Sequence, residues 1–126
     1  MLEINIKTDC GNAPKREFLK DFRIAMAKGN HGFLLNSVTD DIVWNVVGGR
    51  LTEGKDSYSK ELKKVLSNDT KGLTIHQILS HGKEGAINGT IQTETGDVIE
   101  FSEFYVFQGA KGDKIKSMIT YLIQVK

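Results

Sequence analysis

The sequence predicts an α+β fold, with helices in the first half of the chain and an antiparallel sheet in the second. Before Gly72 the apolar residues recur mainly at helical spacing, and after it β-branched and aromatic runs alternate with short glycine-bearing turns. Helices that precede a sheet, instead of alternating with its strands, are typical of the α+β class. The 126 residues fit one domain, 1–126, with residues 1–12 as an N-terminal arm.

The amino-acid composition narrows the classes of function that the chain can have. Apolar residues make up 39% and charged residues 26% of the chain, which is ordinary for a globular protein. The net charge of +1 supplies no basic field for nucleic acid, and no apolar run is long enough to cross a membrane. Cys10 has no second cysteine to pair with, and the N-terminus lacks the apolar run of a secretory signal. We therefore expect a cytoplasmic protein with neither a nucleic-acid nor a membrane partner.

The helical part begins after a short strand or arm that ends in turn residues at 9–12. Residues 14–28 form the first predicted helix, because Phe18, Phe22, Ala25 and Met26 share one stripe and Gly29 follows. Asn30 is placed to cap a short second helix that ends near Thr39-Asp40-Asp41, where we expect turn and capping roles for the two aspartates.

A β-branched run at 42–47 with Trp44 predicts a strand, which Gly48-Gly49 closes. A third helix follows, with Asp56 or Ser57 as its N-cap and Tyr58, Leu62, Val65 and Leu66 on one face, before 67–70 end it. Strands at 73–80, 85–93, 98–107 and 114–125 complete an antiparallel meander, and 108–113 form its last hairpin loop.

Two of these strands carry unusual patterns. Along 98–107, Glu103 occupies the middle of a face that otherwise holds Ile99, Phe101, Tyr105 and Phe107, since side chains alternate along a strand. Along 114–125 both faces are apolar: Met118 and Leu122 share one face, and Ile115, Ile119, Tyr121 and Ile123 share the other. Three helices cover only one face of a sheet, so we expect a homodimer joined through the outer face.

The order of these elements resembles the nuclear transport factor two-like superfamily, in particular its SnoaL-like and ketosteroid-isomerase-like branches. The resemblance spans about residues 14–126 and rests on three pieces of sequence. They are Thr39-Asp40-Asp41 before the strand with Trp44, Gly54-Lys55-Asp56-Ser57-Tyr58 opening the third helix, and Glu103-Phe104-Tyr105-Val106-Phe107 before a Gly-Asp-Lys-Ile turn. It implies a cystatin-like α+β cone, in which a strongly bent antiparallel sheet wraps round three helices and leaves a pocket, often in a dimer.

The resemblance does not extend to the steroid isomerase machinery. The position that matches the catalytic base holds Val46, which cannot take a proton, and Phe22 stands where a tyrosine would stabilise an enolate. Glu103 alone matches a functional group, an acid held neutral in an apolar site. We therefore expect no steroid isomerase activity.

The cone implies a pocket wall drawn from both halves of the chain. Its expected ligand-binding residues are Phe22, Met26, Trp44, Val46, Tyr58, Leu62, Asn88, Phe101, Tyr105, Met118, Thr120 and Leu122. If the turn at 94–97 pairs its strands symmetrically, Asn88 lies opposite Glu103 on the same face. Burial among aromatic rings would favour the neutral form of Glu103, as a hydrogen-bond donor or general acid, unless a lysine, histidine or tyrosine simply satisfies it.

His76 lies on the strand at 73–80, on the expected face of Thr74 and Ile78, and is a second catalytic candidate, with a structural role as its alternative. Three scattered histidines and one cysteine predict no metal site, and no cofactor motif occurs. The sequence thus predicts a protein that binds a small apolar or amphipathic molecule. An isomerase, cyclase or hydratase using Glu103 and a non-catalytic dimerisation domain stay open as alternatives.

Overall fold

The structure is a computed structural model that describes residues 2–11, 13–66, 69–109 and 114–125. The predicted turn at 9–12, the end of the third helix at 67–70 and the hairpin loop at 108–113 each include positions outside these described residues.

The described residues form one curled sheet of seven strands and three helices, which confirms the α+β prediction. The strands are β1 (Glu3–Ile6), β2 (Val38–Val46), β3 (Leu51–Glu53), β4 (Thr70–His81), β5 (Glu84–Thr93), β6 (Val98–Phe107) and β7 (Ile115–Val125). Their order is β1-β4-β5-β6-β7-β2-β3. The predicted meander β4 to β7 is antiparallel throughout, whereas β1 pairs with β4 and β2 with β7 in parallel.

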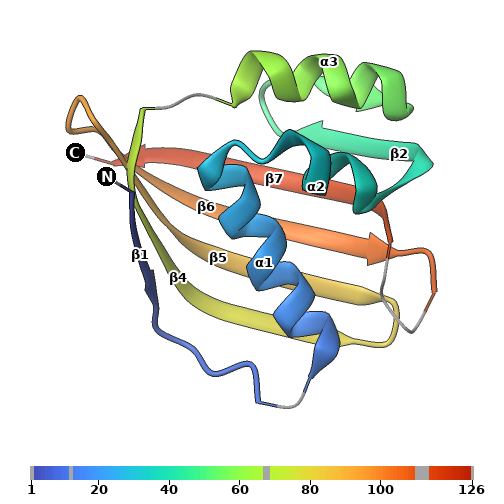
Figure 1. Ribbon diagram of the computed structural model, residues 1–126, viewed down its shortest axis with the longest axis horizontal. Coiled ribbons are helices and arrows are strands. Elements are labelled where there is room, and N and C mark those ends of the chain that lie inside the picture. The colour runs from blue at the N-terminus through green and yellow to red at the C-terminus, as the bar shows by residue number, and fades with distance from the viewer. Residues whose placement is uncertain (1, 12, 67–68, 110–113, 126) are drawn as a thin grey trace.

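The helices are α1 (Pro14–Lys28), α2 (His31–Asn36) and α3 (Lys55–Val65). Figure 1 shows them gathered on the concave side of the sheet, with α1 running across it. Gly29 ends α1 in the left-handed conformation at φ 72°, and the Asn30 side chain accepts a hydrogen bond from the Phe33 N–H. The predicted cap of α3 was wrong: its N-cap is Gly54, so Asp56 lies within the first turn.

The predicted end of the second helix also needs correction. β2 begins at Val38, and Thr39, Asp40 and Asp41 belong to this strand instead of a turn. Pairing of β2 with β7, which starts with Val38 beside Ile115, overrides the local turn preference of the two aspartates. The short strand β3, which folds back on β2, was not predicted, because it is held by that pairing and not by a pattern of its own.

Two of the irregularities in the strand pairing redirect side chains. β4 bulges between Ile75 and Gln77, opposite Gly89, where a Cβ atom would lie 2.1 Å from the Thr74 carbonyl oxygen. A second irregularity, between Val106 and Phe107, alters the pairing with β7 so that Ile115 is fully buried. The prediction that Ile115 lies on the outer face was therefore wrong.

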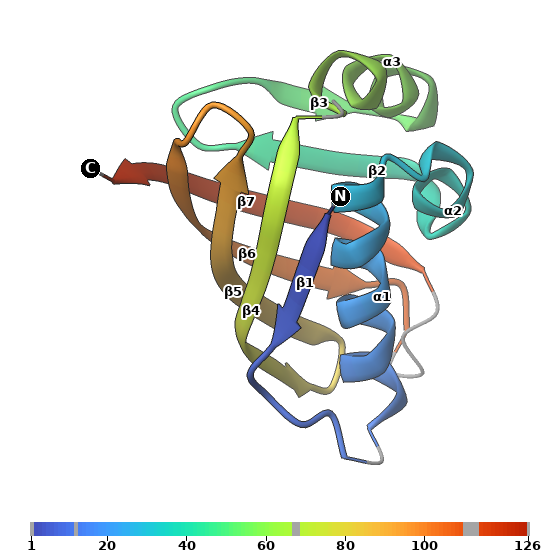
Figure 2. The same cartoon turned by 60° about the vertical axis from the view of Figure 1, so that its left-hand side comes forward.

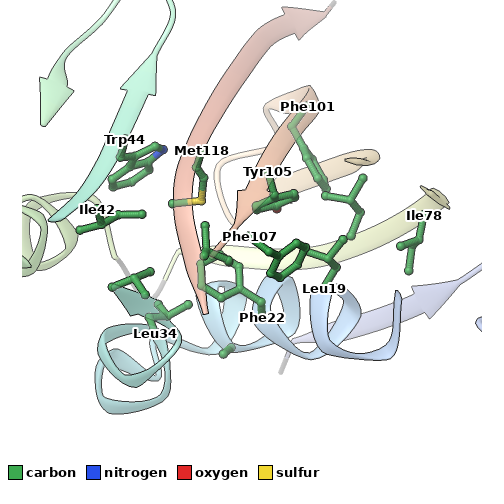
Figure 3. Packing of buried hydrophobic residues seen from close by; sticks show 14 of the residues in the cluster. Leu19, Phe22, Leu34, Ile42, Trp44, Ile78, Phe101, Tyr105, Phe107 and Met118 are labelled. Carbon is green, nitrogen blue, oxygen red and sulfur yellow. The ribbon is translucent and has the colours of Figure 1, made fainter. Parts of the chain in front are cut away.

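The core fills the space between the helices and the concave face of the sheet. Figure 3 shows Phe22 of α1 facing Tyr105 and Phe107, while Trp44 and Met118 lie side by side on the neighbouring strands. The Phe22 and Tyr105 rings meet edge to face, with their centroids 6.0 Å apart. Figure 2 shows the opposite edges of the curl, with β1 beside β4 and β3 beneath α3.

Candidate functional site

A cavity of about 330 Å³ lies on the concave side of the sheet. It is enclosed by the C-terminal parts of α1 and α3, by β2 and the turn after it, and by residues of β4 to β7. Exposed Arg50 and Leu122 mark its mouth. The lining residues are Arg23, Met26, Ala27, Trp44, Val46, Gly49, Arg50, Glu61, Val65, Leu66, Thr70, Leu73, Ile91, Glu103, Thr120 and Leu122.

Glu103 is the buried acid of this cavity, with 1% of its surface exposed. Its Oε1 accepts a hydrogen bond of 2.5 Å from the Tyr105 hydroxyl, and its Oε2 accepts one of 2.7 Å from the Thr120 hydroxyl. The Trp44 indole N–H donates to the Thr120 oxygen over 2.9 Å. An indole only donates, so the Thr120 oxygen accepts from Trp44 while its hydroxyl donates to Glu103.

Arg23 completes the polar cluster, and sequence analysis missed it. Its Nε lies 3.7 Å from Glu103 Oε1, and its guanidinium carbon lies 4.2 Å from the centroid of the Phe101 ring. Both Arg23 and Glu103 are buried. Arg23 lies one turn after Leu19 and one turn before Met26 on α1, so the helical period itself places it on the buried face.

A cation and two hydroxyl donors face the Glu103 carboxyl group. The pKa values of two neighbouring tyrosines are also shifted. Burial, and next the charge of Glu103, raises the pKa of Tyr105 and that of Tyr58. In the described part of the chain the buried Tyr58 hydroxyl has no hydrogen-bond partner, while that of Tyr105 is held by Glu103.

The predicted pocket wall divides into two groups. Met26, Trp44, Val46, Thr120 and Leu122 line the cavity, as does Glu103. The other group, which packs into the core without lining the cavity, consists of Phe22, Tyr58, Leu62, Phe101, Tyr105 and Met118. The side chains of this second group belong to the core instead of the cavity wall.

Asn88 does not lie opposite Glu103. It pairs with Ser102, and Ile87 pairs with Glu103. The turn closes through the Thr93 N–H and the Asp97 carbonyl, one residue tighter than a symmetric turn at 94–97, and a slip of one residue moves a side chain to the other face. Asn88 lines a hollow on the outer face, where its Nδ2 donates to Gln77 over 3.1 Å.

His76 also lies away from the cavity. It occupies the bulge of β4, and its Nε2 contacts the Thr90 hydroxyl at 2.9 Å. Thr90 in turn donates to Glu100. Because of the bulge, Ile75 and Ile78 both face the core and His76 does not share the side of Ile78, which removes it from reach of Glu103.

Charged residues at the mouth of the cavity form a second, weaker pair. Arg50 Nε lies 3.4 Å from Glu61 Oε1, with 64% of the Arg50 side chain exposed. Neither residue was predicted from the sequence, since each is an ordinary surface charge until the turn before β3 and α3 come together.

Within the described ranges, no three or more histidine, cysteine, aspartate or glutamate side chains gather in a way that could hold a metal ion. Among those same residues, no helix has the length and apolarity needed to cross a membrane.

Comparison with known proteins identifies the fold. Neither a protein-family model nor a curated protein sequence matches the chain. Solved structures do match, and they are NTF2-like proteins, including one described as a candidate ketosteroid isomerase and one described as a candidate SnoaL-like polyketide cyclase. At identities of 19% and below, this similarity shows the fold.

Three of these structures illustrate the match. An NTF2-like protein of unknown function from Cytophaga hutchinsonii has a TM-score of 0.70 at 19% identity, over 86% of this chain and 99% of its own. The candidate isomerase from Kribbella flavida has a TM-score of 0.74 at 9% identity, over 89% and 79%. The candidate cyclase from Shewanella denitrificans has a TM-score of 0.72 at 10% identity, over 89% and 92%. The chain therefore has the NTF2-like cone fold that its sequence pattern indicated.

Proposed function

We propose that this chain binds a small apolar or amphipathic molecule in the cavity on the concave side of its sheet. The observation that carries the proposal is the cavity itself. Its volume of about 330 Å³ falls within the range of small-molecule sites, roughly 300–1,000 Å³. Its wall is apolar at Met26, Leu73 and Ile91 and polar at the buried Arg23 and Glu103, as expected for a site that orients an amphipathic guest.

A thermal-shift panel of small apolar and amphipathic compounds tests this proposal. A compound that binds only the folded state raises the melting temperature by mass action. Ala27→Phe places a ring in the cavity and should abolish the shift, while Ala13→Phe, at the other end of α1, is the matched control that should retain it. If no compound stabilises the wild type, or if Ala27→Phe responds as the wild type does, the proposal is wrong.

We further propose that the protein is a homodimer joined through its outer sheet face, defined by Leu79, Phe104, Val106, Ile119, Tyr121 and Ile123. These side chains are 38–63% exposed although all are apolar or aromatic, and contiguous apolar surface is typical of interfaces. The Asn88 Oδ1 atom in the adjoining hollow is buried and has no partner in the described residues. A second copy would cover the apolar side chains and could supply the missing donor.

A second candidate function is proton-transfer catalysis with Glu103 as acid or base, because Glu103 lines the cavity. Steroid isomerisation is disfavoured, since Val46 lines the cavity without a titratable group and Phe22 lies in the core. If the Glu103→Gln variant still binds a compound but no longer converts it, the result would support an enzymatic function. A dimerisation domain without a ligand would show no thermal shift at all.

A further inference from the structure

Arg23 is the least satisfied polar group of the cavity. A guanidinium carries several N–H donors in a rigid fork and no acceptor. Among the described residues, its hydrogen bonding is limited to one contact, from Nη1 to the thioether sulfur of Met26. Its Nε has no hydrogen-bond partner there, because Glu103 Oε1 lies 3.7 Å away, too far for a good bond.

Because Arg23 is buried, its lack of hydrogen-bond acceptors is significant. Arg23 is 5% exposed, and buried donors in folded proteins almost always find an acceptor in the protein, in water or in a ligand. Arg23 lines the cavity, so an acceptor that enters the cavity can approach its guanidinium. The stacked Phe101 ring limits the movement of the guanidinium and so holds it in place.

The other buried polar side chains of the cavity wall, Thr120 and Glu103, are already engaged. The Thr120 hydroxyl accepts from Trp44 and donates to Glu103, so it has no proton left to offer. Both Glu103 oxygens accept hydroxyl protons. The donors that lack an acceptor at the inner end of the cavity therefore belong to Arg23, and a guest would have to bring a hydrogen-bond acceptor to it.

Charge decides which kind of acceptor fits. Arg23 and Glu103 neutralise one another. An anionic guest would leave a net negative charge in a site of low polarity, which is costly, whereas a neutral oxygen accepts a hydrogen bond without adding charge.

Resting on the proposed small-molecule function, we infer that the guest is a neutral amphipathic molecule with an uncharged oxygen, such as that of a ketone, that accepts from Arg23. Its apolar body lies along Met26, Leu73, Ile91 and Leu122. Arg23 is thereby assigned as the residue that orients the ligand.

Three probes with eight carbons each separate a neutral acceptor, a pure hydrocarbon and an anion. They are methyl hexyl ketone, octane and octanoate, and their binding is followed by calorimetry or by thermal shift. The reference protein is wild type, and the test protein carries Arg23→Met together with Glu103→Gln, so that no buried charge is left alone. We expect this change to weaken the ketone roughly tenfold, the worth of one hydrogen bond to a charged donor, and to leave octane within about twofold. Arg16→Met, on the same helix outside the cavity, is the control and should change neither.

Glu103→Gln alone provides an independent arm of the test. It leaves Arg23 as an unbalanced cation, so octanoate should gain about tenfold in affinity over wild type. An equal loss for ketone and octane in the double variant, tighter binding of octanoate than of ketone to wild type, or no gain for octanoate in Glu103→Gln would overturn the inference. Failure of all three probes to bind wild type would count against the proposed function itself.

Discussion

Arg23 and Glu103 form a buried pair between α1 and β6, with 3.7 Å between Nε and Oε1. Glu103 is further held by Tyr105 and Thr120, so its charge is solvated by protein groups instead of water. Arg23 has fewer partners, and it faces the cavity. This asymmetry between the two members of the pair supports the proposal of an acceptor-bearing ligand.

The pair should be strongly coupled in stability. Removing one member leaves the other charge buried alone, so Arg23→Met or Glu103→Gln should each lower the free energy of unfolding by about 3–5 kcal/mol. The double variant should lose much less than the sum, because neither charge then lacks a partner. Urea unfolding of the four proteins measures this cycle.

The matched control for this cycle is the exposed pair Arg50 and Glu61 at the cavity mouth. Its coupling free energy should stay below about 1 kcal/mol, as for other solvent-screened pairs. Additive losses at Arg23 and Glu103 would show that the two side chains do not act as a pair.

The two buried tyrosines should respond oppositely to loss of their hydroxyls. The Tyr58 hydroxyl has no partner in the described residues, so Tyr58→Phe removes an unpaired polar group and should raise the free energy of unfolding by about 1 kcal/mol. Tyr105→Phe removes a donor to Glu103 and should lower it by about 1–3 kcal/mol. Denaturant unfolding compares the two variants directly, and a loss in Tyr58→Phe would point to a partner for that hydroxyl.

Stability should fall in alkaline solution. The pKa of both Tyr58 and Tyr105 is raised in the folded state, first by burial and then by the charge of Glu103. A raised pKa means that the unfolded tyrosine loses its proton first, so the stabilisation is complete below about pH 10 and declines as the pH rises above it.

Each tyrosine should contribute a slope of about 1.4 kcal/mol per pH unit in that alkaline range. Unfolding experiments on wild type, Tyr58→Phe and Tyr105→Phe at several pH values above about 9 can separate the two contributions. Each substitution should reduce the slope by about that amount, and a slope that neither substitution changes would contradict the assignment.

The outer sheet face should hold two chains together. Wild type is expected to sediment as a dimer at micromolar concentration, and Phe104→Lys, which places a charge at a side chain that is 51% exposed, should yield monomers. Val65→Lys changes a residue of similar exposure on α3, on the opposite side of the sheet, and should stay dimeric. A monomeric wild type would leave Ile119, Tyr121 and Ile123 without a covering surface.

The main elements of the fold could be predicted from the sequence, because their signals are local. The stripe on α1 and the alternation along β6 each lie within one element, and the alternation placed Glu103 on the buried face. The features that could not be predicted depend on the pairing register between strands. One residue fewer in the β5–β6 turn moved Asn88 to the outer face, and bulges redirected His76 and Ile115.

Arg23 was missed for a different reason. The helical period places Arg23 on the buried face, but a charged residue there usually extends its charged end to solvent, and the partner on β6 that holds it is distant in the sequence. The alternative to a ligand contact was that a buried lysine, histidine or tyrosine satisfies Glu103; in the structure a tyrosine does so, together with an arginine. A buried carboxylate on an aromatic strand therefore justifies a search for an arginine on the buried face of each helix.

Nuclear magnetic resonance with methyl hexyl ketone tests the central claim, a guest in the cavity, most directly. Trp44 is the single tryptophan of the chain, and it lines the cavity, so its indole N–H is an unambiguous reporter. The account predicts that this resonance and the methyl groups of Met26, Ile91 and Leu122 shift on titration, while those of Leu79, Ile119 and Ile123 on the outer face do not. Shifts confined to the outer face, or none at Trp44 at saturating ketone, would contradict it.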